Sequence, residues 1–476
     1  MSKLLFALFF GNVLVPMLVH PQEIDHDESL KGAIIQEVAA FRKRNRLTSL
    51  SFSFFQGNGS GFDFAVGYAD AGKRIKATPD HIYTIASVTK SITGMTLVDL
   101  VHQNMLSLSD SVHRIIPGFP KNITVLDLLN HTSGFLREKE NEHYLSNSSY
   151  KNITNYLPVK FHLKIHRYAN FNYAALGAVI WKVTHHDFNE IASDYFFSIT
   201  GEPLYFHNQQ HAGSNARFAR NYVRKGRRQI AHNPVKFGIW EPAAFAQTSA
   251  RALAKFLRYH MTPQFIEYIE AHAVKIKTRK YRDDRTVKEC YALGFRLRYV
   301  NDELKYVYHN GFIYGVLSTI YYFPKKDMGF VALSNMSSYP RQALGLGSLY
   351  RRIESAIDRE FNRRVVDYTA RNGFVAGAIF CKTKQHQGEL VEELIEDSAR
   401  DYLNKRKYRE AISLFKLNNF IFPDSGTTYR NLADAYMKNG DDRLAEELRI
   451  QGMMVEQNIR NSANMPKQLD TRHTPK

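Results

Sequence analysis

The chain has 476 residues, enough for two or three domains, and its 44% hydrophobic and 13% aromatic content is that of a globular protein. Sixty-four Lys and Arg against 46 Asp and Glu give a formal net charge of +18, which attracts polyanions such as acidic lipid surfaces or other anionic envelope surfaces, although a solvated basic face is the alternative interpretation. No nucleic-acid-binding motif accompanies this charge, so nucleic acid is not an expected partner.

Residues 1–22 are expected to form a signal peptide or an N-terminal anchor. Lys3 precedes an apolar run from Leu4 to Val19, which is short for a membrane span and has the length of a secretory hydrophobic region. No small-residue cleavage site follows the run, so an uncleaved anchor remains the competing hypothesis. Either way the sequence predicts an exported protein, periplasmic or secreted.

The chain has two cysteines, Cys290 and Cys381, which are too few for a disulfide framework and too far apart for a metal knuckle. Two free thiols are favoured over one bridge. His185 and His186 are adjacent in a polar stretch that has no further ligands at metal spacing, so surface histidines are expected there. No metal and no other cofactor is expected.

Two hairpins are predicted toward the two ends of the central region. From Leu50 to Ala65, two alternating runs flank a Gly/Asn/Ser turn, and near the other end "GVLSTIYYFPKKDMGFVALSN" predicts two apolar strands joined by "PKKDMG". Between them, "SITGMTLVDLVHQ" and "ITVLDLLNHTSGF" have helical spacing. Strands at both ends with helices between them predict an α+β domain whose terminal strands share one sheet.

Ser87 and Lys90 lie three residues apart in "TIASVTKSITG", so on a helix their side chains share a face. The pair Ser413 and Lys416 has the same spacing, and such a pair is expected by chance in a chain of this length. Context separates them. Ser87 opens a helix, where backbone N–H groups and the helix dipole favour negative charge on its oxygen, whereas Ser413 is expected in mid-helix.

A serine nucleophile also needs a group that moves its proton. "RYANFNYAALGAVIWKV" offers Tyr168 and Asn170 just before an apolar helix. The rival pair Tyr150 and Asn152 sits in the polar run "NSSYKNIT" with no helix behind it. The pattern before the apolar helix is therefore favoured.

A third element must present a backbone N–H group and a polar side chain along a strand. "YHNGFIYGVLSTIYYF" offers His309 and Gly311 leading into a strand, while His211 and Gly213 match the short pattern but lie in a basic loop. Each motif alone is weak evidence. The three motifs in order, each in a fitting context, strongly indicate an acyl-transfer site.

The chain from about residue 33 to 345 resembles the serine β-lactamase and penicillin-binding-protein superfamily, in particular its branch of class C-like lactamases, D-aminopeptidases and esterases. The matching stretches are "SVTK" at 87–90, "YAN" at 168–170, "HNG" at 309–311, "LLNHTSG" at 128–134 and "FAQTSARALAKFL" at 245–257. The resemblance implies an antiparallel sheet with helices on both sides, plus an all-α subdomain, with the site between them.

Carried over by position, the resemblance implies that Ser87 is acylated and that Lys90, held among apolar walls that disfavour its charge, exchanges protons with it. Tyr168 would be the base or relay, and Asn170 would hold Lys90 and the substrate amide. The N–H groups of Ser87 and Phe312 would form the oxyanion hole.

The third motif departs from the lactamase pattern. True lactamases carry Lys-Thr-Gly or Lys-Ser-Gly there, whereas this chain has His309, Asn310 and Gly311. A histidine is mostly neutral at neutral pH, so this departure shifts the expected activity from antibiotic hydrolysis toward a peptidase or esterase. The resemblance thus implies an exported serine hydrolase acting on a D-amino-acid cell-wall peptide or a small ester. The alternative is a catalytically weak binding or scaffold protein at the envelope.

The C-terminal part has a different character. After a connecting segment at 346–391, Ala411 and Ala445 stand 34 residues apart within similar patterns, and residues 392–459 resemble two tetratricopeptide repeats, with Arg406 where the first copy would have Gly. Two repeats are fewer than usually stand alone, so they are expected to dock on the catalytic domain, a protein partner or a second copy. A helical hairpin that merely completes the fold is the alternative. Residues 460–476 are expected to be a polar tail.

Overall fold

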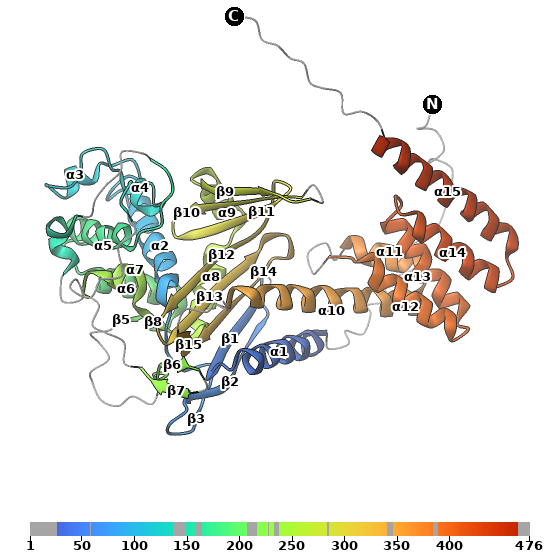
Figure 1. Cartoon of the computed structure of the whole chain (residues 1–476), viewed down its shortest axis with the longest axis horizontal. Helices are drawn as coiled ribbons and strands as arrows, with labels where there is room; N and C mark the ends of the chain where they lie inside the picture. The colour runs from blue at the N-terminus through green and yellow to red at the C-terminus, as the bar shows by residue number, and fades with distance from the viewer. Residues whose placement is uncertain are drawn as a thin grey trace, which may run out of the picture.

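Figure 1 shows the computed structural model of the chain, in which one large sheet is packed between helices and is followed by a group of C-terminal helices. The expected segment 1–22 lies outside the described residues. The structure describes residues 26–57, 59–136, 149–157, 164–206, 217–226, 228–232, 238–282, 285–339, 346–383 and 389–464.

The large sheet has nine strands in the order β3-β2-β1-β14-β13-β12-β11-β10-β9, and every neighbouring pair is antiparallel. Both predicted hairpins are confirmed, because β1 pairs with β2 and β13 pairs with β14. Strand β1 also pairs with β14, so strands from the two ends of the domain share one sheet, as predicted. The strands are β1 (Ser49–Gln56), β2 (Gly61–Asp70), β3 (Ile75–Lys76), β9 (Val274–Lys280), β10 (Thr286–Ala292), β11 (Phe295–Val300), β12 (Glu303–Ile313), β13 (Val316–Phe323) and β14 (Met328–Ser334).

Two smaller sheets of three strands flank the large one. In the first, β15 (Met336–Tyr339) pairs with β6 (Tyr222–Lys225), and β6 pairs with β7 (Arg228–Ala231). In the second, β8 lies between β4 and β5, and the chain leaves β4 directly into the turn that carries Ser87. The strands of this second sheet are β4 (Tyr83–Thr84), β5 (Tyr205–Phe206) and β8 (Ala246–Thr248).

Helices α1 (His26–Asn45) and α10 (Leu349–Asn372) lie side by side on one face of the large sheet (Figure 1). The buried residues of α1 recur every three or four positions, at Leu30, Ile34 and Val38, which places them on the helix face that meets the sheet. They pack into a core that includes aromatic side chains of β1, β12 and β13.

The other face of the sheet packs against the remaining helices of the domain, so β13 and β14 are buried along their whole length. These helices are α2 (Thr89–His102), α3 (Val112–Ile115), α4 (Val125–Leu129), α5 (Asn170–Thr184), α6 (Phe188–Thr200), α7 (Glu241–Ala244), α8 (Ala250–His260) and α9 (Pro263–Ala271). Together the layers form the α+β fold with a helical subdomain that the resemblance implies.

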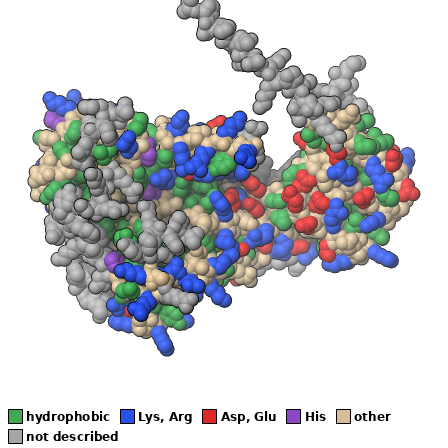
Figure 2. All heavy atoms as spheres, in the orientation of Figure 1, with side chains coloured by type: hydrophobic (Ala, Val, Ile, Leu, Met, Phe, Trp, Pro, Cys, Tyr) green, Lys and Arg blue, Asp and Glu red, His purple; other side chains and the backbone are tan. Residues whose placement is uncertain are grey.

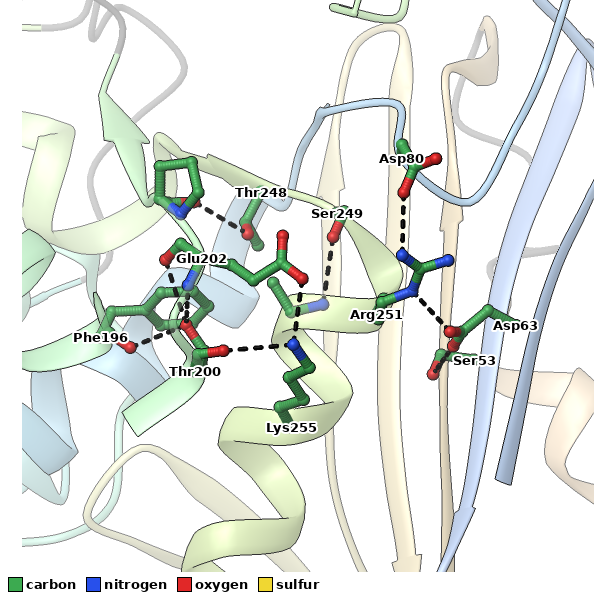
Figure 3. Close-up of polar contacts among 12 residues, drawn as sticks. Ser53, Asp63, Asp80, Phe196, Thr200, Glu202, Thr248, Ser249, Arg251 and Lys255 are labelled. Atoms are coloured by element: carbon green, nitrogen blue, oxygen red, sulfur yellow. Dashed lines mark hydrogen bonds and ion pairs between the residues drawn. The ribbon is translucent and has the colours of Figure 1, made fainter. Parts of the chain in front are cut away.

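Ion pairs fasten α8 to its neighbours (Figure 3). Arg251 Nε lies 2.6 Å from Asp63 Oδ2 on β2, and its Nη1 lies 3.0 Å from Asp80 Oδ1. One turn further along α8, Lys255 Nζ lies 3.1 Å from Glu202 Oε1. Because β8 immediately precedes α8 and pairs with β4, this attachment also holds the strand beside the Ser87 turn.

Helix α2 and the β10–β11 turn touch backbone to backbone. A Cβ atom at Gly94 would lie 2.2 Å from Leu293 O, and one at Gly294, where φ is +94°, would lie 2.5 Å from Lys90 O and 2.9 Å from Ser91 Cα. Glycine is therefore required on both sides of this contact.

The segment at 346–391, expected only to connect two parts of the chain, packs against both of them. Helix α10 packs its first half against the sheet, whereas Val366 in its second half joins a core with Ile395, Ala399 and Leu414. Helix α11 (Phe374–Thr383) follows it. One long helix thus joins the domain to the C-terminal helices.

Residues 392–459 form four helices that pack in succession. Arg406 and Gly440 both adopt a left-handed conformation, with φ of +58° and +88°, in the turns within the two helix pairs. The two turns therefore match despite the Arg, while the tetratricopeptide assignment remains a prediction. The helices are α12 (Glu392–Asn404), α13 (Tyr408–Ile421), α14 (Gly426–Lys438) and α15 (Asp442–Asn464), and α15 extends into the expected polar tail.

Cys290 and Cys381 are both free thiols, as favoured from the sequence. Among the described residues, no helix combines the length and the apolar character needed to cross a membrane.

We predict that Gly294→Ala destabilises the protein by about 3 kcal/mol, because the new methyl group both overpacks the contact with α2 and strains a positive φ. Gly201→Ala is the matched control: its φ is +66°, but nothing lies within 4 Å of the added Cβ atom, so it bears only the strain. Chemical denaturation of both variants measures the difference. An equal loss of unfolding free energy in the two variants would show that the close contact with α2 has no effect on stability.

Candidate active site

Ser87 lies in a single 3-10 turn, η1 (Ala86–Val88), directly before α2. Its neighbour Ala86 has φ of +46°, a conformation that a residue with a side chain rarely adopts outside constrained sites. Ser87 itself is half-buried, at the amino end of α2, where the helix dipole favours negative charge. The turn thus presents the hydroxyl group rather than burying it in the helix.

Hydrogen bonds from three directions hold this strained turn. The Ile85 N–H group donates to Ala246 O at 3.0 Å, and the Ser318 hydroxyl donates to Ile85 O at 2.5 Å. From α2, the Thr89 hydroxyl donates to Ala86 O at 2.7 Å. The conformation is therefore imposed by β8, β13 and α2 together.

Lys90 is completely buried, and its Nζ faces three oxygen atoms. It donates to Asn170 Oδ1 and to Ala243 O, both at 2.8 Å, and lies 3.5 Å from Ser87 Oγ. Three acceptors match the three N–H groups of an ammonium ion.

The surroundings of Lys90 are not purely apolar, although the resemblance implies apolar walls. Besides the three oxygens, its Nζ lies 4.9 Å from the ring centroid of Tyr168 and 5.5 Å from that of Tyr173. The negative faces of aromatic rings attract a cation. The Lys90 amine is therefore surrounded by three oxygen atoms and two aromatic rings.

Tyr168 and Asn170 flank Ala169 at the start of α5, and both are half-buried. His131, in the turn after α4, positions this segment: its O accepts from the Arg167 N–H group at 2.8 Å and its Nδ1 accepts from the Ala169 N–H group at 3.3 Å. The structure thus brings the second motif to Lys90 through a residue of the "LLNHTSG" stretch.

His131 is a neutral, fully buried ring. Its Nδ1 accepts a hydrogen bond, so the proton of the neutral form is on Nε2. Burial, and next the nearby Lys90 cation, holds the pKa of His131 well below its ordinary value. The ring centroid lies 4.4 Å from that of Tyr168, so His131 supports the phenol as a wall.

The third motif lies within β12, whereas the sequence analysis placed it just before a strand. His309 is buried, with Nδ1 3.0 Å from Asn310 O and Nε2 3.3 Å from the Tyr291 hydroxyl. A carbonyl only accepts, so Nδ1 carries the proton and Nε2 accepts. Burial, reinforced by the Arg296 charge, holds the pKa of His309 well below its usual range.

Gly311 lets β12 approach the Ser87 turn. A Cβ atom there would lie 2.1 Å from Ser318 Oγ, 2.6 Å from Ile85 O and 3.0 Å from Ala86 Cβ. Strand β11 pairs with β12 only as far as Tyr308, so the stretch from His309 through Phe312 runs past the end of β11 and lies beside η1. The three predicted motifs therefore meet at one place.

Arg296 was missed by the sequence analysis. It lies on β11 opposite Tyr308, and its guanidinium carbon is 5.7 Å from the Tyr168 ring centroid and 5.8 Å from that of Tyr291. The alternation in "FRLRYV" places Arg296 and Arg298 on one face of a strand, and this was the available signal. The strand pairing that brings Arg296 to the site could not be predicted from this alternation.

The rival motifs do not form comparable arrangements. Ser413 lies in the middle of α13, where its hydroxyl donates to Arg409 O at 2.9 Å. Tyr150 is in an irregular turn, and its hydroxyl accepts from the Phe188 N–H group. His211 and Gly213 lie outside the described residues.

A separate cleft of about 710 Å³ opens between the β1–β2 turn and α8. Its wall includes Arg251 and Lys255, which are already ion-paired, and it contains none of the predicted site residues.

A model of the Beta-lactamase family matches residues 34–349. Protein flp of Staphylococcus aureus (strain MW2) is 27% identical over 293 residues, which cover 57% of this chain and 56% of that protein. Teichoic acid D-alanine hydrolase of Staphylococcus aureus (strain MRSA252) is 28% identical over 282 residues, covering 54% of this chain and 63% of that protein. The chain thus spans less than two thirds of the length of these curated relatives.

Solved structures show the same fold. The D-amino acid amidase from Ochrobactrum anthropi SV3, in complex with L-phenylalanine amide, aligns with a TM-score of 0.59 over 69% of this chain and 98% of that chain. The sequence identity is 19%, so this likeness concerns the fold alone. It confirms the fold class that the sequence predicts.

We predict that Gly311→Ala lowers the rate at which nitrophenyl acetate acylates the protein by about a hundredfold, because the strand must retreat from the turn and misplace the reacting groups. The release of nitrophenolate measures the rate. Gly226→Ala is the control, because nothing lies within 4 Å of a Cβ atom at that positive-φ glycine. Retention of the full rate by Gly311→Ala would contradict the assigned contact.

We predict that stability falls as pH drops from about 6.5 toward 4, because buried histidines with lowered pKa values take up protons only on unfolding. His166, whose pKa burial lowers to about 4, contributes about 1.4 kcal/mol per pH unit within this window. In His166→Gln the slope of unfolding free energy against pH should be shallower by that amount. An unchanged slope in chemical denaturation would exclude the effect.

Proposed function

We propose a function for this chain, which belongs to the Beta-lactamase family. It is a serine hydrolase that forms an acyl-enzyme at Ser87 and hydrolyses an amide or ester. The observation that carries the proposal is the position of Lys90 Nζ between Ser87 Oγ, Asn170 Oδ1 and Ala243 O. A buried ammonium beside a strained, dipole-facing hydroxyl favours negative charge developing on that oxygen.

In the first step, Ser87 Oγ attacks the carbonyl carbon and its proton passes to Tyr168, which acts as the general base and whose ring centroid lies 4.9 Å from Lys90 Nζ. The carbonyl oxygen becomes an oxyanion, which the N–H groups of Ser87 and Phe312 would receive, at roughly 3 kcal/mol for each donor. The carbon–nitrogen or carbon–oxygen bond then breaks, and the leaving group takes the proton from Tyr168.

In the second step, a water molecule attacks the acyl-enzyme and gives its proton to Tyr168. The bond to Ser87 Oγ breaks and Ser87 takes the proton back, so the enzyme returns to its starting state. Asn170 keeps Lys90 in place and faces the substrate amide. No cofactor takes part in this scheme.

The acyl group we propose is that of a D-amino acid, in a cell-wall peptide or an ester. The name of the curated relative, teichoic acid D-alanine hydrolase, supports this choice. Within the site, His309 is held neutral while the Arg296 charge acts on it, and a guanidinium can bind the carboxylate of a peptide substrate. A peptide ending in D-amino acids is therefore the first candidate and a small ester the second.

We also propose that the protein acts outside the cytoplasm, because an apolar run follows Lys3 at the start of the chain. The helices at 392–459 remain candidates for binding a protein partner. The competing hypothesis, a binding protein with little turnover, is opposed by the retained contacts of Lys90.

Turnover of D-alanine and L-alanine p-nitroanilides, measured for the wild type and for Ser87→Ala, tests the proposal. We expect a preference for the D-isomer and a loss of at least about a thousandfold in kcat/KM in the variant. Equal turnover by folded Ser87→Ala would refute the assigned nucleophile, and a preference for the L-isomer would refute the substrate class.

We predict that Arg296→Gln raises KM about tenfold or more for a D-Ala-D-Ala peptide but leaves nitrophenyl ester turnover within about twofold, because only the peptide carries a carboxylate. Arg298→Gln is the matched control, since it lies on the same face of β11 but pairs with Glu289. A similar effect in the control, or on the ester, would contradict the role of Arg296.

A further inference from the structure

Helix α11 exposes apolar side chains where a surface helix normally carries polar ones. Residues 374–381 read "FVAGAIFC", and none of the eight carries a charge, an amide or a hydroxyl group. Val375 is 68% exposed and Ile379 is 58% exposed. Phe420 of α13, which is 47% exposed, extends this surface, because its ring centroid lies 5.9 Å from that of Phe374. We call Val375, Ile379 and Phe420 the α11 face.

The opposite side of α11 is seated closely on α10. A Cβ atom at Gly377 would lie 2.2 Å from Thr369 Oγ1, and the Phe380 ring stacks on the Tyr368 ring with the centroids 4.7 Å apart. By helical spacing, Gly377 and Phe380 lie on the side of α11 away from the α11 face. The α11 face therefore points outward in a direction that is fixed relative to α10, and α10 in turn packs on the large sheet.

The charges near the α11 face have one sign. Residues 368–383 contain Arg371 and Lys382 and no Asp or Glu. Lys382 comes three positions after Ile379, a spacing that places the two residues on the same side of a helix. The neighbouring helices differ: residues 392–459 have thirteen acidic and ten basic residues, and Figure 2 shows Asp and Glu side chains gathered over the C-terminal helices. An apolar, cationic surface thus adjoins an acidic group of helices.

We propose that the α11 face rests on a membrane surface that contains anionic lipids, with α11 parallel to the membrane plane. The ten residues of α11 span about 15 Å, half of a hydrocarbon core of about 30 Å, so the helix can lie on a membrane but cannot cross it. The side chains of the α11 face would enter the boundary between headgroups and acyl chains, while Arg371 and Lys382 attract the headgroups. This inference is independent of the proposed reaction.

Charge complementarity favours lipid over the two other occupants of an apolar face. A second copy that met the same face would bring its own Arg371 and Lys382 toward these cations, and like charges repel. The apolar run at 4–19 is the other candidate, but residues 1–22 contain Lys3 and no Asp or Glu, so this segment supplies no anion. An anionic membrane supplies both an apolar interior and negative charge.

The start of α1 lies on the same half of α10 as α11. The Ser29 hydroxyl donates to Glu360 Oε2 at 3.1 Å, whereas α11 is seated at Thr369, and these two places are about 14 Å apart along the axis of α10. The N-terminal anchor that the sequence predicts would thus join the molecule near the α11 face. One short apolar contact binds a membrane weakly, whereas two contacts together hold stably.

The test places a tryptophan at each of two equally exposed apolar positions of the full chain. Ile379→Trp probes the α11 face. Met453→Trp on α15 is the matched control, because Met453 is 60% exposed but follows the exposed acids Glu446 and Glu447. Vesicles contain phosphatidylglycerol and brominated phosphatidylcholine, whose bromine atoms quench a tryptophan that contacts the acyl chains. The emission of the unchanged chain is the baseline, and no hydrolysis is measured.

We expect the vesicles to quench the added emission of Ile379→Trp by about half or more and to shift it to the blue, and to leave that of Met453→Trp unchanged. Adding Arg371→Gln and Lys382→Gln to Ile379→Trp should raise the lipid concentration needed for the same quenching by about tenfold, because each cation near an anionic surface strengthens binding about fivefold. Circular dichroism checks that all variants are folded.

Equal quenching of the two probes would overturn the proposal, and so would the absence of quenching of Ile379→Trp. An equal response to vesicles without phosphatidylglycerol, or an unchanged response after Arg371→Gln and Lys382→Gln, would contradict the anionic surface. Blue-shifted emission of Ile379→Trp before lipid is added would show that the α11 face is already covered. In that case, loss of the shift on dilution would identify a second copy, and its persistence would identify residues 4–19.

Discussion

The contact between strand β12 and the Ser87 turn is the constraint on which the rest of the site depends. It is close enough that only glycine fits at Gly311, and Ser318 and Ala246 complete the frame by bonding Ile85. The strained φ of Ala86 persists because β13 and β14 behind the turn are buried on both faces and cannot yield. The position of the nucleophile is therefore a property of the whole sheet.

The charges around the site follow from this frame. Lys90 keeps three oxygen partners and two aromatic faces, so its positive charge is compensated without an acidic residue. Two neighbouring histidines, His131 and His309, stay neutral because they are buried beside cations. The site therefore holds the Lys90 amine beside Ser87 and, close to Tyr168, the Arg296 guanidinium that we assign to a substrate carboxylate.

Local patterns predicted much of this arrangement. The two hairpins, the helix behind Ser87 and the helix that begins at Asn170 follow from alternation and helical spacing over short stretches. What the sequence could not show depends on contacts between distant segments: Arg296 reaches the site through strand pairing, and Gly294 is needed only because α2 touches its turn. The sequence analysis did not predict that α10 packs in two cores. Apolar residues in its first half contact the sheet, and Val366 in its second half contacts the C-terminal helices.

The most direct test of the central claim is the intact mass of the purified protein after reaction with a fluorophosphonate and, separately, with a penicillin, for the wild type and for Ser87→Ala. The account predicts one fluorophosphonate adduct on the wild type, mapped to Ser87, and none on the variant. A penicillin adduct in addition would favour the peptidase over the esterase. No adduct on a folded wild type, or an adduct that persists in Ser87→Ala, would contradict the account.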